Sequence, residues 1–361
     1  MRLGWGAEPT RYEFGVGEKG LGGNPPRPAK LTDGHPRGKT FECQSGEGVL
    51  VVLNRVARKI TLRGVAITRK DRRLNLRLIS YSHRGESGVG VMVDDDGFVA
   101  LAKAAPELPR SLRGIVELGD DALAKAKAAA AGRSADHHLG DVIVDPLIPE
   151  PPAIWCVGVN YAAHREETGR MPSDEPTMFM RIGASQVGHG QAMVVPKASS
   201  MLDYEGELAV IIGTGGRHIP RSEAMNHIAG YSCYNDGSVR DWQRHTSQFG
   251  PGKNFHRTGG FGPWLLTADE LPNPYEQTLV TRVSGEELQR TTIDLMLFRI
   301  DELIEYLSTM YPLNPGDVIS TGTPAGVGWK REPQRFLVAG DVVEVEISGV
   351  GTLSNPVVAE S

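Results

Sequence analysis

The stretch L-D-Y-E-G-E-L-A-V-I-I, residues 202–212, decides the fold at the centre of this chain. Its second half is an uninterrupted apolar run of strand length, which predicts a strand buried on both faces. Side chains alternate between the faces of a strand, so Glu205 and Glu207 point in the same direction beside that core. Adjacent buried carboxylates repel each other and destabilise a fold unless a cation lies between them. The stretch therefore predicts a cation site.

A third acid follows in the stretch Y-N-D-G-S-V-R-D-W-Q, residues 234–243. Asp236 lies there in a polar turn after a short apolar run. If a short helix starts at Asp236, Arg240 and Gln243 lie on the same face as the acid, four and seven residues further on. Three carboxylates with no Cys or His at ligand spacing favour a hard divalent ion. The predicted helix would place two hydrogen-bond donors beside that ion.

A His–Glu pair follows a predicted buried strand over residues 154–161. His164 and Glu167 are three residues apart, so on a helix the carboxylate can orient the imidazole and raise its basicity. Such a pair suits a general base near neutral pH. The H-x-x-E spacing alone is a weak motif, and a charged surface turn is the alternative interpretation. The Pro-bounded segment 172–176 is a candidate for a mobile lid.

Three further features could contribute polar groups to a site. Arg181 is a candidate for binding a substrate carboxylate, and a surface salt bridge is the equal alternative. Lys253 lies in the loop G-P-G-K-N-F, residues 250–255, where glycines let the backbone approach a ligand closely. The loop T-G-T-P-A-G-V-G, residues 321–328, includes Thr323 and offers N–H and O–H donors to carboxylates.

Composition and charge argue against several kinds of partner. The chain has 361 residues, of which 40% are hydrophobic and 23% charged, as in ordinary soluble globular proteins. Its net charge of −5 gives no overall attraction for nucleic acid or for an anionic membrane. The three cysteines form no C-x-x-C pair, which argues against a disulfide framework or a zinc site. Without a long apolar segment or a secretory signal, the sequence predicts a cytoplasmic protein.

The sequence predicts three parts. Residues 1–75 form a basic, Gly- and Pro-rich extension without a sustained helix or strand period, which we expect to be disordered or spurious. Residues 76–148 are expected to form a small α/β module, and residues 149–361 the catalytic domain. The predicted strands outside the site cover residues 78–82, 88–93, 98–101, 341–347 and 351–358, and the predicted helices cover residues 122–131 and 294–310.

Five motifs in order along the chain resemble those of the fumarylacetoacetate hydrolase superfamily, in its branch of acylpyruvate hydrolases and 2-hydroxyhepta-2,4-diene-1,7-dioate isomerases. They are N-Y-x-x-H-x-x-E at 160–167, D-Y-E-x-E at 203–207, N-D-x-x-x-R-D-x-Q at 235–243, G-K-x-F at 252–255 and T-G-T-P-x-G-V-G at 321–328. The resemblance covers about residues 76–358. It implies an α+β fold with a mixed β-roll or partly open barrel, preceded by a small N-terminal α/β module, and a homodimer.

The resemblance also implies roles for individual residues. The metal ligands are Glu205, Glu207 and Asp236, the catalytic residues are His164, Glu167 and Lys253, and the substrate-binding residues are Arg240, Gln243 and Thr323. The ion is expected to be Mg²⁺ or Mn²⁺. The family usually has Lys where this chain has Arg181, so no role is transferred to Arg181. Asp203, which shares the alternation of the two glutamates, is expected to frame the site rather than to bind the ion.

The implied activity is hydrolytic cleavage of a C–C bond in a 2,4-diketo acid of the acylpyruvate or fumarylpyruvate type, through a metal-bound enolate. Because His164 and Glu167 can activate water, we favour hydrolysis over isomerisation. The alternatives are an isomerase or decarboxylase of hydroxymuconate-like or oxaloacetate-like 2-oxo acids, and a non-catalytic protein that binds such a metabolite. A regulatory protein recruited through the basic extension is a further alternative. The expected partner is thus a small acid, with no nucleic acid and no membrane.

Overall fold

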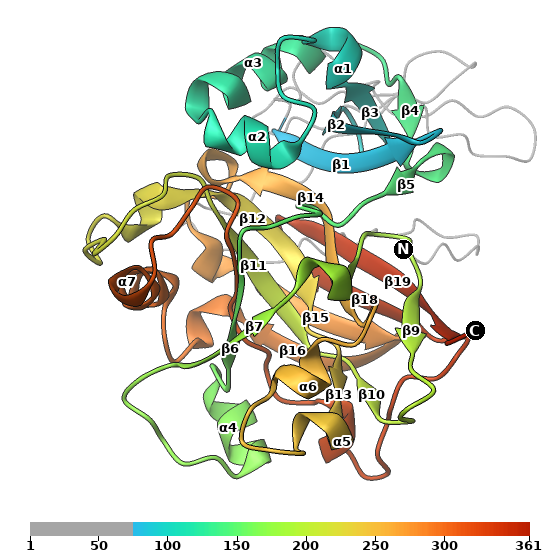
Figure 1. The fold of residues 1–361 in the computed structure, drawn as a ribbon, viewed down its shortest axis with the longest axis vertical. Helices are drawn as coiled ribbons and strands as arrows, with labels where there is room; N and C mark the ends of the chain where they lie inside the picture. The colour runs from blue at the N-terminus through green and yellow to red at the C-terminus, as the bar shows by residue number, and fades with distance from the viewer. Residues whose placement is uncertain (1–74) are drawn as a thin grey trace, which may run out of the picture. The chain divides into compact units, whose positions relative to one another are not determined.

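The computed structural model describes residues 75–361 (Figure 1), so the predicted basic extension lies outside the described residues except for its last position. The described strands form a 12-stranded sheet with parallel and antiparallel pairs, a five-stranded sheet and a two-stranded ribbon. Within residues 75–361 neither large sheet closes on itself. This arrangement of mixed sheets and helices confirms the predicted α+β fold in its partly open form.

Strands and short helices alternate in the first part of the described chain. Three predicted strands are present with bounds shifted by one or two residues, and the predicted helix 122–131 begins two residues earlier and ends one residue earlier. The turn that contains the aspartates before Gly97 joins two antiparallel strands. The elements are β1 Arg77–His83, β2 Glu86–Met92, β3 Gly97–Ala100, α1 Leu101–Ala104, α2 Leu112–Glu117, α3 Asp120–Ala130, β4 His137–His138 and β5 Ile143–Val144.

The large sheet continues from this module into the rest of the chain. Strand β1 pairs antiparallel with β14 (Gly259–Thr267), and the strand order is β4-β3-β2-β1-β14-β12-β11-β17-β6-β7. One apolar core includes Leu78 and Ile115 of the module together with Ile211 and Leu265 of the later strands. Helices α1, α2 and α3 lie over one face of β1, β2 and β3 (Figure 1). The module thus extends the sheet that carries the site.

The central hairpin is formed by β11 (Gly206–Ile212) and β12 (Ile228–Asn235), and both strands are buried along their whole length. Before it, the short strand β10 (Leu202–Asp203) pairs with β13 (Ser238–Val239). Tyr204 and Glu205 therefore lie between two strands, although the alternation argument treats Glu205 and Glu207 as parts of one extended strand. This interruption places Glu205 between two ladders instead of within one.

Gly206 is required by close packing. A Cβ atom at this position would lie 2.0 Å from the Thr281 hydroxyl oxygen, on strand β15 (Thr278–Val283). Such a distance is far inside van der Waals contact, so any larger residue would force the Thr281 side chain out of its position. In the structure Gly206 allows the two sheets to meet directly behind Glu205 and Glu207.

The five-stranded sheet packs against the central hairpin through a second core, which includes Leu208 and Val210 with Leu279 and Val345. Its strand order is β16-β15-β18-β19-β9. The remaining elements of this layer are β16 Glu286–Thr292, β18 Val342–Ile347, β19 Gly351–Ala359, β9 Met193–Val195 and α7 Ile300–Met310. The predicted helix 294–310 is thus too long, because Ile293–Leu295 form a 3₁₀ turn and α7 begins at Ile300.

The site is carried by the central hairpin and by elements on either side of it in the sequence. Strand β6 runs parallel to β17 and antiparallel to β7 at the far end of the large sheet, and β8 joins β14. Helices α4, α5 and α6 lie at one end of the strands (Figure 1). The bounds are β6 Ile154–Gly158, α4 Ala162–Thr168, β7 Thr177–Arg181, β8 Gln186–Val187, α5 Arg240–Gln243, α6 Gly250–Lys253 and β17 Val318–Ser320. Across residues 75–361, no helix has the length and apolar character needed to cross a membrane.

Candidate active site

The three predicted metal ligands lie close together in the structure. Oxygen atoms of Glu205, Glu207 and Asp236 all lie within 4.8 Å of one another. Glu205 precedes β11, Glu207 is inside it, and Asp236 directly follows its partner strand β12. All three residues are at most 5% exposed. The antiparallel pairing of β11 with β12 is what brings Asp236 to the two glutamates.

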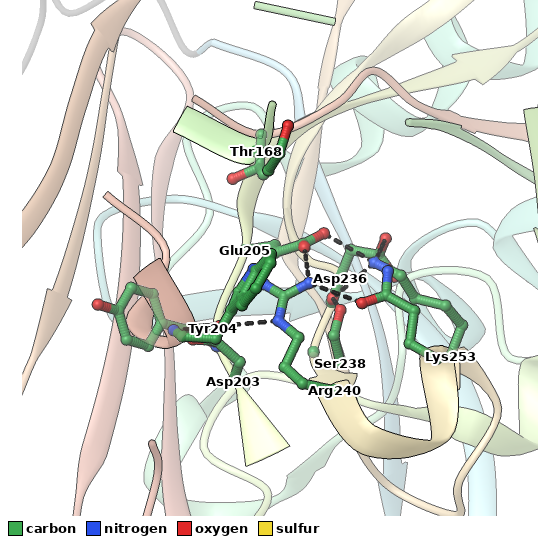
Figure 2. A network of polar contacts seen from close by, with 12 residues as sticks. Thr168, Asp203, Tyr204, Glu205, Asp236, Ser238, Arg240 and Lys253 are labelled. Carbon is green, nitrogen blue, oxygen red and sulfur yellow. Dashed lines mark hydrogen bonds and ion pairs between the residues drawn. The ribbon is translucent and has the colours of Figure 1, made fainter. Parts of the chain in front are cut away.

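Lys253, at the end of α6, links two of these carboxylates. Its Nζ atom donates to Glu205 Oε2 at 2.7 Å and to Asp236 Oδ2 at 2.5 Å (Figure 2). Burial alone would raise the pKa of Glu205, but Lys253 and Arg240 outweigh it and lower that pKa to about 2. Burial alone would likewise lower the pKa of Lys253, and Asp236 and Glu205 reverse this and raise it. The Lys253 ammonium and the Glu205 carboxylate are therefore both charged at neutral pH.

Glu207 is in a different position. Its Oε2 atom accepts hydrogen bonds from the Ser320 hydroxyl at 2.5 Å and from the Gly322 amide at 2.8 Å. No Lys, Arg or His of residues 75–361 forms an ion pair with it. Burial, followed by the charges of Asp236 and Glu205, raises its pKa well above the usual range. A buried, unpaired carboxylate beside two others is a donor set that fits a divalent cation.

Arg181 is buried and lies behind the acids. Its Nη1 atom donates to Asp236 Oδ1 at 2.6 Å and to the Gly237 carbonyl at 2.9 Å, and Nη2 donates to the Thr258 hydroxyl at 3.1 Å. Both interpretations offered from sequence are therefore wrong, because the side chain is neither on the surface nor free to bind a substrate. The guanidinium instead fixes one oxygen of Asp236, and Lys253 contacts the other.

Asp203 accepts hydrogen bonds with both oxygens and holds a loop in place. Its carboxylate receives the backbone N–H groups of Gly328 at 2.8 Å and Trp329 at 3.0 Å, and Arg240 Nε at 2.8 Å. Burial raises the pKa of this carboxyl against the opposing effect of Arg240. These contacts fit the framing role that the resemblance implies, because Asp203 uses both of its oxygens to hold Arg240 and the backbone of Gly328 and Trp329.

Arg240 lies between Asp203 and the acid triad (Figure 2). Its Nη1 atom lies 2.6 Å from Glu205 Oε1 and 3.0 Å from the Gln243 side-chain oxygen. Its Nη2 atom is buried and has no hydrogen-bond partner among the described residues. The helix here begins at Arg240, so the predicted helix starting at Asp236 is wrong: Ser238 and Val239 form β13 first. A buried guanidinium with one free donor can bind an oxygen of a ligand.

His164 and Glu167 form the predicted pair on α4. His164 Nδ1 lies 2.9 Å from Glu167 Oε2, and Glu167 Oε1 accepts the Gly326 amide at 2.9 Å. Because the carboxylate accepts from Nδ1–H, Nε2 is the basic nitrogen of the ring. No hydrogen bond from residues 75–361 occupies Nε2. The loop 321–328 thus orients the carboxylate that orients the imidazole.

The start of α4 is fixed by Asn160. Its side-chain amide donates to the carbonyls of Phe298 at 3.0 Å and Thr321 at 2.8 Å, and its oxygen accepts the Phe298 amide at 2.7 Å. The preceding Val159 has φ 61°, in the left-handed region that a β-branched residue rarely adopts. The chain therefore leaves β6 through a constrained bend, and this bend determines where His164 lies.

One cavity of about 230 Å³ joins these groups. The predicted residues that line it are Glu205, Glu207, His164, Lys253, Arg240, Gln243 and Thr323. The other two predicted residues contact this lining, because Glu167 bonds to His164 and Asp236 bonds to Lys253. The sequence reasoning missed Thr168, Arg170, Phe179, Arg244, Phe249 and Trp329, which also line it. Only Arg244 had a signal, because it follows Arg240 at the spacing of one helical turn.

Comparison with known proteins agrees with this geometry. The family described as fumarylacetoacetate (FAA) hydrolase C-terminal matches residues 153–358. The mitochondrial oxaloacetate tautomerase fahd2 of Xenopus laevis is 37% identical over 292 residues, which cover 79% of this chain and 91% of the relative. The oxaloacetate tautomerase YisK of Bacillus subtilis is 37% identical over 287 residues, 74% of this chain and 95% of the relative.

A solved structure extends the likeness to three dimensions. Maleylpyruvate hydrolase from Sphingobium sp. SYK-6, in complex with manganese(II) ion and pyruvate, superposes with a TM-score of 0.66 at 26% identity. The match covers 79% of this chain and 100% of that structure. The resemblance drawn from the five motifs is thereby confirmed, and the chain belongs to the fumarylacetoacetate hydrolase family.

Proposed function

We propose that the protein catalyses keto–enol tautomerisation of a small 2-oxo dicarboxylic acid of the oxaloacetate type. The observation that carries the proposal is the position of His164, which has a free Nε2 and lines the same cavity as Glu205 and Glu207 of the acid triad. Two relatives at 37% identity are named oxaloacetate tautomerases, which supports the same reaction here. The proposal reverses the order favoured from sequence, where hydrolysis came first and isomerisation second.

Tautomerisation needs one base and a means of stabilising negative charge. The C3–H bond breaks, a C2–C3 double bond forms, and the 2-oxo oxygen accepts a proton; the reverse steps return the keto form. His164 can accept the proton at one position and deliver it to the other, since Glu167 stabilises the imidazolium between the two steps. Arg240 Nη2 and the Gln243 amide supply donors for the oxygens of the acid. No water has to enter the reaction.

The carboxylates Glu205, Glu207 and Asp236 would hold Mg²⁺ or Mn²⁺, both of which favour oxygen ligands. When bound, such an ion supplies Lewis-acid stabilisation for negative charge on the 2-oxo acid. Lys253 adds a fixed positive charge that already pairs with two of the ligands. The pairing of Asp236 with Arg181 and Lys253 fixes the direction of its oxygens before any ion binds.

The test is the rate at which enol-oxaloacetate converts to the keto form, followed by ultraviolet absorbance with and without Mg²⁺. We expect a metal-dependent acceleration over the buffer reaction. Exchange of the C3 protons for solvent deuterium, followed by NMR, should be accelerated to the same degree, because both observations report proton transfer at C3. Wild-type protein that binds oxalate with Mg²⁺ but accelerates neither process would contradict the proposal and favour a metabolite-binding protein.

Hydrolysis of a 2,4-diketo acid is the second candidate. The same imidazole can take a proton from water, which then attacks the 4-carbonyl carbon; the C3–C4 bond breaks and C3 receives the proton. The likeness to a maleylpyruvate hydrolase supports this reaction. It predicts release of pyruvate from fumarylpyruvate, measured with a coupled lactate dehydrogenase assay. A turnover of fumarylpyruvate faster than that of enol-oxaloacetate would make hydrolysis the main activity.

A further inference from the structure

Two arginines, Arg170 and Arg244, line the outer part of the cavity, and neither belongs to a family motif. Each follows a short helix that carries an inner group of the site. Helix α4 carries His164 and ends one residue before Gly169, whose φ of 69° turns the chain toward Arg170. Helix α5 begins with Arg240, and Arg244 follows directly after it. Each helix thus supplies one inner and one outer polar group.

Neither outer arginine has an acidic partner among residues 75–361. The Arg170 side chain makes no hydrogen bond or ion pair there, and the side chain of Arg244 makes only one hydrogen bond, from Nε to the Arg240 carbonyl at 3.2 Å. The inner cations differ, because Arg240 and Lys253 both pair with buried carboxylates. The inner charges of the cavity are therefore largely balanced by the protein, whereas its outer part carries two uncompensated positive charges.

Aromatic rings hold both guanidinium groups. Arg170 lies over the ring of Phe249 at 5.1 Å, and Arg244 lies over the ring of Trp329 at 4.8 Å. Both rings also line the cavity. A guanidinium that stacks on a ring through its face keeps its N–H donors at the edge, where they can bind an anion. Stacking also lowers the entropy that each long side chain loses when a ligand binds.

We propose that Arg170 and Arg244 bind the distal carboxylate of a dicarboxylic substrate and make the site select dicarboxylates over monocarboxylic 2-oxo acids. The inference takes one point from the proposed function, namely that the 2-oxo acid end of the substrate binds at the acid triad and Arg240. With that end fixed, the rest of the molecule extends toward the outer part of a cavity of about 230 Å³. An anionic group there meets two unpaired guanidinium groups, whereas a methyl group leaves both of them without a partner.

The experiment compares two five-carbon ligands that differ only at the far end, 2-oxoglutarate with a carboxylate and 2-oxopentanoate with a methyl group. Dissociation constants are measured by calorimetry on the full chain with saturating Mg²⁺. We expect wild type to prefer 2-oxoglutarate. Arg170→Gln and Arg244→Gln should each weaken 2-oxoglutarate about ten-fold, as for loss of one charge-assisted hydrogen bond, and change 2-oxopentanoate by less than about two-fold.

Arg165→Gln is the matched control, because Arg165 lies on the same helix α4 but does not line the cavity. It should leave both dissociation constants at wild-type values. Raising the salt concentration should reduce the preference for 2-oxoglutarate in wild type and in this control, and have little effect in a double Gln variant. Circular dichroism melts confirm that the variants are folded, which is expected because both arginines are exposed.

The inference is decided by the ratio of the dissociation constants of 2-oxoglutarate and 2-oxopentanoate, and not by turnover. An unchanged ratio of the two dissociation constants in Arg170→Gln and in Arg244→Gln would overturn it and leave both arginines as solvated surface groups. Equal binding of the two ligands by wild type would also overturn it. Wild type that shows the Arg-dependent preference but does not tautomerise enol-oxaloacetate would refute the proposed function and support the inference, so the two failures are distinguishable.

Discussion

The inner and outer parts of the cavity are built on opposite principles. At the inner end, Glu205 and Asp236 are buried and paired with Lys253, and strands of the central hairpin hold them. At the outer end, Arg170 and Arg244 are exposed, have no acidic partner among residues 75–361 and follow helices of seven and four residues. Changes at the inner end should therefore alter stability and chemistry together, whereas changes at the outer end should alter ligand choice alone.

The largest effect is expected for His164→Asn, which removes the base and leaves the acid triad intact. Turnover should fall by about 10²- to 10⁴-fold, the usual contribution of a general base. The affinity for Mn²⁺, measured by calorimetry, should stay within about two-fold of wild type, since His164 is not a ligand. Glu166→Gln is the control, because Glu166 lies exposed on the same helix. If Glu166→Gln lost as much activity, the effect would belong to the helix and not to the imidazole.

Arg181→Met tests whether the inner ion pairs also hold the fold. The change leaves Asp236 buried with Lys253 as its remaining cation, and breaking such a buried pair costs about 3–5 kcal/mol of unfolding free energy. Denaturation by urea measures the loss. Arg221→Met is the matched control: Arg221 is 45% exposed and pairs with Asp301 and Glu302 on the surface. Its loss should cost at most about 1 kcal/mol. Equal losses in both variants would remove the distinction between buried and exposed pairs.

Glu207→Gln separates binding of the ion from stability. Glu207 has no cation partner among the described residues and burial raises its pKa, so the apo protein should become more stable when a neutral amide replaces this carboxyl group, as measured by thermal melting in EDTA. The affinity for Mn²⁺ should fall by more than the roughly 10- to 100-fold typical of outer-shell changes. Asp203→Asn should keep that affinity, because the carboxylate of Asp203 binds backbone amides and Arg240. Loss of Mn²⁺ binding in Asp203→Asn would make it a ligand.

The part of the site that could be predicted from sequence is the part whose arrangement depends on local patterns. Alternation along a strand and the repulsion of buried charges pointed to Glu205 and Glu207, and a polar turn after a short apolar run pointed to Asp236. The structure places these three acids within 4.8 Å of one another. Helical spacing likewise predicted the contact between His164 and Glu167, which the structure shows at 2.9 Å. Most of the strands also followed from local patterns, whereas the α+β class came from the resemblance that the five motifs carry. What these residues share is that their arrangement is determined within one element or one hairpin.

The features that were missed depend on contacts between distant segments. Arg181 meets Asp236 across 55 residues, and nothing in its own neighbourhood distinguishes it from a surface arginine. The break in the strand at Tyr204 and Glu205 arises because β10 pairs with β13 instead of continuing along β12. Arg170 belongs to the cavity only because the chain turns at Gly169. Such positions require the fold before their function can be considered.

The smallest effect is expected at Asp317, a buried carboxylate that forms no ion pair among residues 75–361. Its Oδ2 atom accepts the Asn314 amide at 2.7 Å, but Oδ1 has no partner in the described part of the chain. Burial, against the opposing Asn314 hydrogen bonds, raises its pKa to about 6. The folded state therefore binds this proton more tightly than the unfolded state, in which the pKa of Asp is about 3.9. The stability that protonation contributes is fully present below about pH 4 and is lost as the pH rises through 6.

Asp317→Asn keeps an oxygen for the Asn314 amide and removes the titration, so the comparison isolates the buried charge. The unfolding free energy of wild type relative to this variant should fall by about 1–2 kcal/mol between pH 4 and pH 7, less than a full two-unit shift because water screens part of the charge. Urea denaturation at several pH values measures this difference, in which the other titrating groups cancel. Glu117→Gln, at an exposed carboxylate, should show no such trend. A flat difference for Asp317→Asn would mean that burial without a cation is tolerated here, and the contrast between paired and unpaired carboxylates would then apply only to the acid triad.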